Sequence, residues 1–445
     1  MLITDAYDLQ VLRCAILVHA CLAGVAAANG RPPASNAVFF KPGDPQSIYV
    51  ATTFGLLAST DACHFYWFCE QDIGIGGGFD PHYGVTAVGT IIATTFSGVR
   101  ISRDGGCSFT TQLGTYYTSG LAIGPTGDVW VGTSDAGSGN AVFVSHDDGA
   151  SFDPPAATTT LPGTMWFRSL AAAPSDPSRV YVSGYQVSAG AMPPSTHLFR
   201  TDDHGVTWVE LAVTGLTYAN QPTLDLAAVD PTDPNIVYLI SRLASPPYGD
   251  ILYRSDNAGA TIAQVLATAS TINGTVVRQN HVVDVTTQND GLYESSTGTA
   301  FSVISTQLQF GCLGERSDGT LFACASNYEP DYKALASSHD GVTWAPALQF
   351  EYLTGPLDSC AIGTAEQDIC AGMFDSLGVQ LGKQDSQCST GSGSPVPDAG
   401  VRDIAVPPAH RATGCCGAAP ARQSIVLALL VLAWTVCRRR NRTPR

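Results

Sequence analysis

The sequence predicts an all-β protein built from about seven repeats, each with the length of one β-propeller blade. Two observations carry this prediction. The 445 residues include 45 glycines and 27 prolines, which favour short strands joined by turns over long helices. An eight-residue segment also recurs along the chain, and the copies follow short runs of β-branched or aromatic residues. We expect a β-propeller of seven blades, with eight blades as the alternative.

The repeated segment reads Ser/Thr-x-Asp-x-Gly-x-Ser/Thr-aromatic. Three copies fit it without a gap, at 102–109, 145–152 and 201–208. Copies with one or two changes begin at Ser255 and Ser337, and worn copies begin at Ser59 and Ser295. Successive starts are 43, 43, 56, 54, 40 and 42 residues apart, which is the spacing expected of propeller blades.

The chemistry of this segment is that of a tight turn between two strands. The Asp carboxylate is expected to accept backbone N–H groups within the turn, and the glycine supplies a positive φ. The aromatic residue is expected to pack between neighbouring blades. The residues with these structural roles are Asp104, Gly106, Phe109, Asp147, Gly149, Phe152, Asp203, Gly205, Trp208, Gly259, Gly341 and Trp344.

This pattern resembles the Asp-box (BNR) motif of sialidases, sortilin-type receptors, xyloglucan hydrolases and the photosystem II assembly factor. The resemblance covers roughly residues 36–385 and implies the propeller fold. Because the motif stabilises the outer edge of a blade, away from the axis, it does not identify a function. Residues 360–381 contain no copy. We expect them to form strands that complete a blade with residues 37–40 and so close the ring.

Residues 1–28 are predicted to be a secretory signal peptide. From Cys14 to Ala28 the chain is small and apolar and ends in an alanine run, as such peptides do. Asp5 and Asp8 are unusual there, so we suspect that the true start is Val11; a buried N-terminal helix is the alternative. The propeller is assigned to residues 29–385. Residues 386–413, rich in Pro, Gly and Ser, are expected to form a flexible stalk.

The C-terminal segment 414–445 has three features in order: Cys415 and Cys416, an apolar stretch at 425–437, and a cluster of arginines. The stretch is 13 residues long, shorter than the roughly 20 that normally span a bilayer. The segment resembles the MYXO-CTERM sorting tail of myxobacteria. That resemblance implies a sorting protease that acts near Cys415 or Cys416 and retention at the cell surface through the membrane segment. Plain anchoring by a short helix is the alternative.

The charge of the chain argues against one class of partner. The net charge is −16, and without residues 1–28 and 414–445 the remainder carries 15 basic and 36 acidic side chains, a net of −21. Such a surface repels phosphate backbones, so no nucleic acid is expected as a partner.

Eight cysteines lie between the two terminal segments, an even number that favours disulfides in an exported protein. Cys312 and Cys324 are equidistant from a turn at 317–319, and Cys360 and Cys370 are equidistant from residues 364–366. Each pair is expected to face across a β-hairpin and to form a bond. The three possible pairings of the others stay open: Cys63, Cys69, Cys107 and Cys388. Neither a metal site nor a cofactor is predicted, because no CxxC spacing with flanking histidines occurs.

The known enzymes of this type need residues that the sequence does not offer clearly. A sialidase needs three arginines around a carboxylate, yet the region of its usual first arginine reads Val38-Phe-Phe-Lys-Pro42. A xyloglucanase needs two acidic residues across a cleft, and no pair stands out among the many turn aspartates.

Propeller ligands bind near the axis, where the innermost strands begin. Residues expected there combine flat aromatic faces with hydrogen-bond donors: Tyr83, Tyr117, Trp166, Arg168, Asn220, Arg278 and His281. The sequence therefore favours a non-catalytic cell-surface module that binds a glycan, a peptide or an envelope protein. A secreted glycosidase and a purely structural surface protein are the alternatives.

Overall fold

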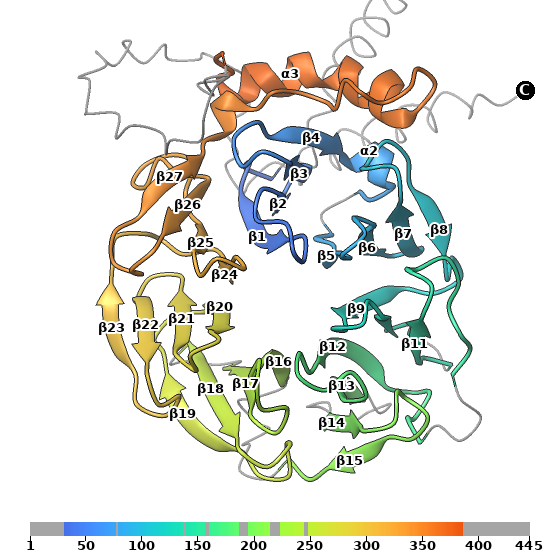
Figure 1. The fold of residues 1–445 in the computed structure, drawn as a ribbon, viewed down its shortest axis with the longest axis vertical. Helices are drawn as coiled ribbons and strands as arrows, with labels where there is room; N and C mark the ends of the chain where they lie inside the picture. The colour runs from blue at the N-terminus through green and yellow to red at the C-terminus, as the bar shows by residue number, and fades with distance from the viewer. Residues whose placement is uncertain are drawn as a thin grey trace, which may run out of the picture. The chain divides into compact units, whose positions relative to one another are not determined.

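The computed structural model describes residues 31–76, 79–136, 139–155, 160–186, 195–213, 223–243 and 248–385. The expected signal peptide, stalk and sorting tail lie outside these residues. Seven antiparallel sheets follow one another around a ring (Figure 1). The prediction of an all-β propeller with seven blades is confirmed, and the alternative of eight is wrong.

Each blade is a sheet whose strands lie in sequence order from the axis outward. Blade 1 contains β1 (Ser35–Phe40), β2 (Ile48–Thr52), β3 (Gly55–Ser59) and β4 (Tyr66–Cys69). Blade 2 contains β5 (Tyr83–Val85), β6 (Ile91–Thr95), β7 (Gly98–Ser102) and β8 (Thr110–Gln112). Blade 3 contains β9 (Thr118–Ile123), β10 (Val129–Thr133) and β11 (Val142–Ser145). Blades 4 and 5 contain β12 (Trp166–Ala172), β13 (Val180–Gln186), β14 (Ser195–Thr201) and β15 (Val209–Leu211); and β16 (Asp225–Val229), β17 (Val237–Arg242), β18 (Asp250–Ser255) and β19 (Ala263–Ala267). Blades 6 and 7 contain β20 (Ile272–Val277), β21 (Val283–Thr287), β22 (Gly291–Ser295) and β23 (Ser302–Ser305); and β24 (Gly314–Glu315), β25 (Leu321–Cys324), β26 (Leu335–Ser338) and β27 (Ala345–Leu348).

Blade 3 differs from the other six because its sheet has three strands. On the outer side of β11, the described residues contribute one isolated bridge, between Val144 and Asp153.

The middle strands of the blades are buried on both faces because consecutive blades stack against each other. In β2, β6 and β10 every residue is buried, which explains their near-continuous apolar sequences. The apolar side chains form clusters that join neighbouring blades. One cluster, for example, contains Trp130 of blade 3 together with Phe167 and Trp208 of blade 4.

The repeated turn has the hydrogen bonds expected from its residues. In blade 2, the Asp104 carboxylate accepts the Ser102 hydroxyl at 2.8 Å and the Ser108 backbone N–H at 3.0 Å. Gly106, at φ 103°, donates its N–H to the Ser102 hydroxyl. The same bonds recur around Asp147, Asp203 and, with an amide in place of the carboxylate, Asn257. In blade 7 the turn begins at Ser338, one residue later than the predicted Ser337, since Ser338 contacts Asp340 and Gly341.

The aromatic residues of these turns pack on the preceding blade, as predicted. Phe109 contacts the cluster that contains Phe68 of blade 1, and Phe152 contacts the cluster around Ile101 of blade 2. Trp208 lies edge-on to Trp130 at 6.3 Å between ring centres. Trp344 lies 5.4 Å from Phe310. Each such turn therefore joins two blades.

The prediction that residues 360–381 form strands is wrong. They contain a π-helical turn, η2 (Glu366–Cys370), followed by the helix α3 (Ala371–Leu381), which crosses the outer side of β4 (Figure 1). Phe374, Leu377 and Leu381 are buried at helical spacing. They pack in the cluster of Phe54 and Trp67 in blade 1.

We call residues 353–381 the C-terminal clamp. It begins where the Trp67 N–H donates to the Gly355 carbonyl at 2.7 Å, and the Thr354 N–H donates to the Phe65 carbonyl at 2.9 Å. The ring is therefore closed by a segment that packs on the outer strand of blade 1. The predicted closure, a blade shared between the two ends of the propeller, is not present, because β1 to β4 form a complete blade by themselves.

The disulfides tie this clamp to two blades. The predicted Cys312–Cys324 bond is confirmed. The predicted Cys360–Cys370 bond is wrong, because the residues between these cysteines turn into a helix instead of a hairpin. Cys370 bonds to Cys69 and Cys360 bonds to Cys107; Cys63 is disulfide-bonded as well. Within the described ranges, no helix is both long and apolar enough to cross a membrane.

Candidate functional site

The up-and-down order of strands gives the propeller two faces. We call the face on which each innermost strand begins the loop face; it also carries the connections between the second and third strands. The opposite face carries the repeated turns and the connections between the first and second strands, and we call it the turn face.

The structure divides the predicted binding residues between these faces. Tyr83 and Trp166 begin the innermost strands β5 and β12, Arg168 follows in β12, and Tyr117 directly precedes β9. These four therefore belong to the loop face. Asn220 lies outside the described residues.

Arg278 and His281 lie on the turn face, so the prediction that they precede an innermost strand is wrong. The innermost strand β20 ends at Val277, and β21 begins at Val283, which places both residues in the connection after it. The sequence did not distinguish these two apolar runs, since either is compatible with an inner strand.

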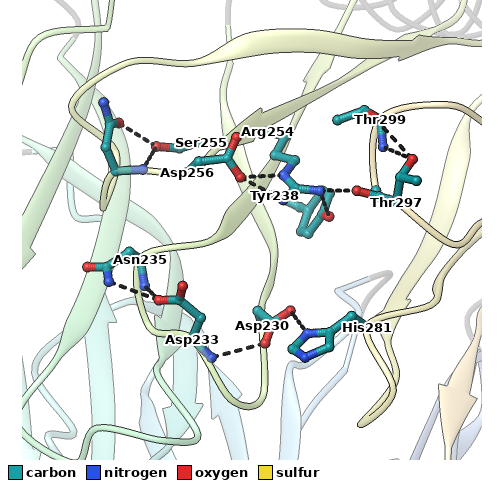
Figure 2. A network of polar contacts seen from close by, with 12 residues as sticks. Asp230, Asp233, Asn235, Tyr238, Arg254, Ser255, Asp256, His281, Thr297 and Thr299 are labelled. Carbon is teal, nitrogen blue, oxygen red and sulfur yellow. Dashed lines mark hydrogen bonds and ion pairs between the residues drawn. The ribbon is translucent and has the colours of Figure 1, made fainter.

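His281 links two blades on the turn face. Its Nδ1 lies 2.8 Å from a carboxylate oxygen of Asp230, in the first connection of blade 5 (Figure 2). Asp230 also accepts the backbone N–H of Asp233. Burial alone would raise the pKa of Asp230, but the hydrogen bonds from His281, Asp233 and Thr232 outweigh it and lower the pKa. Nearby, Arg254 of blade 5 contacts the hydroxyl of Tyr238 and the Thr297 carbonyl of blade 6. This is an inter-blade network that holds blades 5 and 6 together.

Arg278 has a similar structural role. Its Nε donates to Asp284, a carboxylate with no solvent exposure in β21. Burial raises the pKa of Asp284 to about 6, although the nearby Arg278 charge opposes the shift.

Arg168 is the centre of the loop-face residues. Its Nε lies 3.3 Å from Asp225, the first residue of β16 in the next blade. His82 of blade 2 is exposed, but desolvation by the surrounding protein atoms, with the Arg168 charge, lowers its pKa. Burial raises the pKa of Tyr185 in blade 4, against the effect of Arg168. Side chains from three blades thus lie within electrostatic range of one guanidinium group.

Two groups of aromatic rings lie on the loop face, and each contains a tyrosine whose pKa is affected by the Arg168 charge. Trp166 and Tyr185 pack at 5.4 Å between ring centres. Phe96 stacks on Tyr117 at 4.9 Å and contacts Phe79 at 4.5 Å, and Phe96 is 59% exposed. Burial and the nearby Tyr185 raise the pKa of Tyr117, and the positive charge of Arg168 opposes this shift. The Trp166–Tyr185 group and the Phe96–Tyr117 group therefore both lie near the Arg168 charge.

Tyr83 differs from these residues. It stacks with Phe39 at 6.1 Å, and its hydroxyl is buried without a hydrogen-bond partner. Burial, with the charge of Glu70, raises its pKa far above the ordinary value. Tyr83 therefore packs between blades 1 and 2.

A second ion pair on the loop face was missed from the sequence. Arg242 ends β17 and lies 3.8 Å from Asp250, which begins β18. The Asp250 carboxylate also accepts the Ile272 N–H at 2.8 Å. Burial raises the pKa of Asp250, and the negative charge of Asp225 adds to this shift. The hydrogen bond from the Ile272 N–H and the positive charge of Arg242 oppose it. The two ion pairs are therefore neighbours. No motif marks them, because they come together only through strand register.

The carboxylates of the loop face are mostly engaged. Asp80 forms two 2.8 Å contacts with Arg31, and Asp135 accepts the Tyr117 N–H. Asp225 and Asp250 are the pair that interacts electrostatically. No group of three or more His, Cys, Asp or Glu side chains suited to a metal occurs among the residues with assigned structure.

Comparisons with known proteins give limited information. No family model matches the sequence. The xyloglucanase Xgh74A of Acetivibrio thermocellus is 31% identical over 100 residues, which cover 22% of this chain and 11% of that enzyme. The chain thus matches about a tenth of the length of that relative.

Solved structures with a similar fold include an ancestral GH74 enzyme (15% identity, TM-score 0.49, covering 73% of this chain and 56% of the other). They also include YCF48 from Cyanidioschyzon merolae (13%, TM-score 0.38, 71% and 85%) and the GH74 xyloglucanase from Xanthomonas campestris (13%, TM-score 0.33, 73% and 66%). These values assign no family to the chain, and its seven-bladed architecture rests on its own sheets.

Proposed function

We propose that this protein is a non-catalytic binding propeller that takes a glycan on its loop face. The observation that carries the proposal is the half-exposed Arg168 within electrostatic range of two aromatic groups, Trp166 with Tyr185 and Tyr117 with Phe96. Sugar rings present one apolar face, which stacks on aromatic side chains. Their hydroxyl groups form hydrogen bonds with charged side chains such as arginine and aspartate.

The arrangement favours a glycan over a peptide or an envelope protein for two reasons. The aromatic rings come from separate blades and lie on the same face as the charged groups Arg168 and Asp225, which suits a ligand with alternating flat and polar parts. The core of an interface between folded proteins is depleted of charged residues, whereas the loop-face residues described here mix aromatic rings with ion pairs. A peptide and an envelope protein are therefore outcomes of the test.

The repeat type and the location belong to the same proposal. The turn hydrogen bonds of blades 2 to 5 support assignment of the chain to the Asp-box (BNR) propellers. Residues 1–28 direct export, and a sorting protease processes the tail near Cys415 or Cys416, so that the propeller is retained at the cell surface. Mass spectrometry of the mature protein tests both sites, and an intact tail at the surface would contradict the second.

A glycan array and a panel of fluorogenic glycosides, both applied to the full-length chain, test the function. Binding without turnover is the expected result. Turnover that persists through further purification contradicts the non-catalytic assignment. If no glycan on the array binds and the protein instead captures a peptide or an envelope protein, the proposal of a glycan ligand is wrong.

A secreted glycosidase is the second candidate, and one observation favours it. Asp225 and Asp250 interact, and the pKa of Asp250 is raised by burial; glycoside hydrolysis uses a carboxyl group with a raised pKa together with a second carboxyl group. Against it, Asp250 is buried and holds the Ile272 N–H. If hydrolysis is found, D225N and D250N should each abolish it.

A further inference from the structure

The arginines of this protein fall into two groups by their contacts. Six of those that form ion pairs in the described residues have a carboxylate at 2.5–2.8 Å, and their own side chains are 14–27% exposed: Arg31, Arg179, Arg200, Arg254, Arg278 and Arg316. Arg168 and Arg242 differ in both respects. Their nearest carboxylate contacts are 3.3 and 3.8 Å, and their side chains are 47% and 48% exposed.

The contact of Arg168 leaves part of its guanidinium available. Asp225 approaches the Nε edge of the group at 3.3 Å, and the Tyr185 hydroxyl is a further polar neighbour, whereas the edge between the two terminal nitrogens is a different one. Those nitrogens form the planar fork that binds a carboxylate through two parallel hydrogen bonds. Arg242 is held even more loosely, through one terminal nitrogen at 3.8 Å. Two adjacent blades therefore each offer one cation that is only partly neutralised.

From this geometry we infer that the glycan of the loop face is acidic, with a carboxylate on the sugar that binds Arg168 and is supported by Arg242. This inference rests on the proposed function and names its ligand class. The sugar ring lies against Trp166 and Tyr185 or against Phe96 and Tyr117, while its carboxylate reaches the Arg168 fork. A uronic-acid polysaccharide has this chemistry in every repeat.

The charge of the rest of the protein sharpens the inference. The propeller and stalk carry a net charge of −21, which repels polyanions in general. A polyuronate therefore binds through a local site or not at all, and background binding to the surface is small. An acidic peptide carries the same carboxylates without the ring, so it is the control ligand.

The test compares polygalacturonate with the same polymer after its carboxylates have been reduced to alcohols, by isothermal titration calorimetry on the full-length chain. We expect the reduced polymer to bind at least tenfold more weakly. R168Q should lose at least tenfold in affinity for polygalacturonate, and R168K should lose less because the charge remains. R103Q, an exposed arginine in the repeated turn of blade 2, is the matched control and should bind like the parent protein.

The outcomes separate this inference from the proposed function. Equal binding of the two polymers and an unchanged R168Q overturn the acidic ligand and leave the glycan-binding function intact. Absence of binding to every glycan overturns both. If polyglutamate binds more strongly than polygalacturonate, the ligand is an acidic peptide and the inference of an acidic glycan is overturned. If R168Q does not fold, the comparison of polygalacturonate with its reduced form on the parent protein still shows whether the ligand must carry a carboxylate.

Discussion

The sulfur atoms of Cys69 and Cys370 are bonded although 301 residues separate them in the chain. Cys69 ends the outer strand of blade 1, and Cys370 lies at the junction of η2 and α3 in the C-terminal clamp. With Cys107–Cys360, this bond fixes the clamp to blades 1 and 2. The closure of the ring is therefore covalent.

Replacing both residues of this bond should destabilise the protein by a predictable amount. While Cys107–Cys360 remains, the additional loop that Cys69–Cys370 closes is about 50 residues, worth about 4 kcal/mol in the chain-entropy account. C69S/C370S should show this loss in chemical denaturation. C312S/C324S, which opens a short loop, should lose about 3 kcal/mol. Equal or reversed losses would show that loop entropy does not govern the clamp.

The clamp should also be less stable at alkaline pH. Asp72, in the short helix α2 (Glu70–Ile73), and Glu366 of η2 are buried, and each has one carboxyl oxygen without a partner. Burial, with the charge of Asp104, raises the pKa of Asp72 to about 7. Burial, with the charge of Asp72, raises the pKa of Glu366 to about 8 against the Leu357 hydrogen bond.

The sign follows from proton linkage. The unfolded chain releases these protons near pH 3.8 and 4.5, while the folded chain keeps them to about 7 and 8. Stability from this pair is complete below about pH 4 and is lost progressively up to about pH 8. E366Q should flatten the dependence of the melting temperature between pH 5 and 9. D375N, an exposed residue of α3, should leave it unchanged, and a slope that E366Q does not reduce belongs to groups other than Glu366.

Two adjacent glycines of blade 2 should respond differently to the same substitution. Both have positive φ, 78° at Gly105 and 103° at Gly106. A Cβ at Gly105 meets nothing within 4 Å, whereas one at Gly106 lies 2.3 Å from the Phe68 ring. G105A should cost about 1–2 kcal/mol for its backbone conformation. G106A should cost a further 1–3 kcal/mol, roughly, from overpacking. Urea denaturation measures both, and similar losses would reject tight packing of the turn on blade 1.

Phe96 should matter for binding more than for folding. Its ring is 59% exposed and contacts Tyr117 and Phe79 on the loop face. Loss of a stacking partner worth about 0.5–1.5 kcal/mol should weaken glycan binding about twofold to tenfold in F96A. The melting temperature should change little. F109A removes an aromatic residue of the repeated turn. It should lower the melting temperature and leave glycan binding nearly unchanged.

Local chemistry made the fold predictable from the sequence. The turn residues Asp104, Gly106 and Phe109 form contacts with near neighbours and one adjacent blade, so a short pattern specifies them. The Cys312–Cys324 bond was accessible for the same reason, since it spans one hairpin. The helix α3 was missed because its apolar spacing at Phe374, Leu377 and Leu381 was interpreted as strands.

The candidate site was only partly predictable. Trp166 and Arg168 were found because they begin an inner strand, but Arg278 was misplaced by one strand. The Arg242–Asp250 pair depends on the register of β17 with β18, and its electrostatic interaction with Asp225 depends on the position of β16. Such relationships between strands leave no short pattern in the sequence.

The bond between Cys69 and Cys370 also determines how the protein carries mechanical load. In a propeller without such a bond, tension on the C-terminus peels the last blade away strand by strand. Here a pull on the chain beyond Asp385 travels along α3 and passes through sulfur into β4 of blade 1. Blade 7 is shielded from that tension. If the tail anchors the protein at the cell surface as proposed, a bound ligand under flow would load the ring through this bond and not through its last strand.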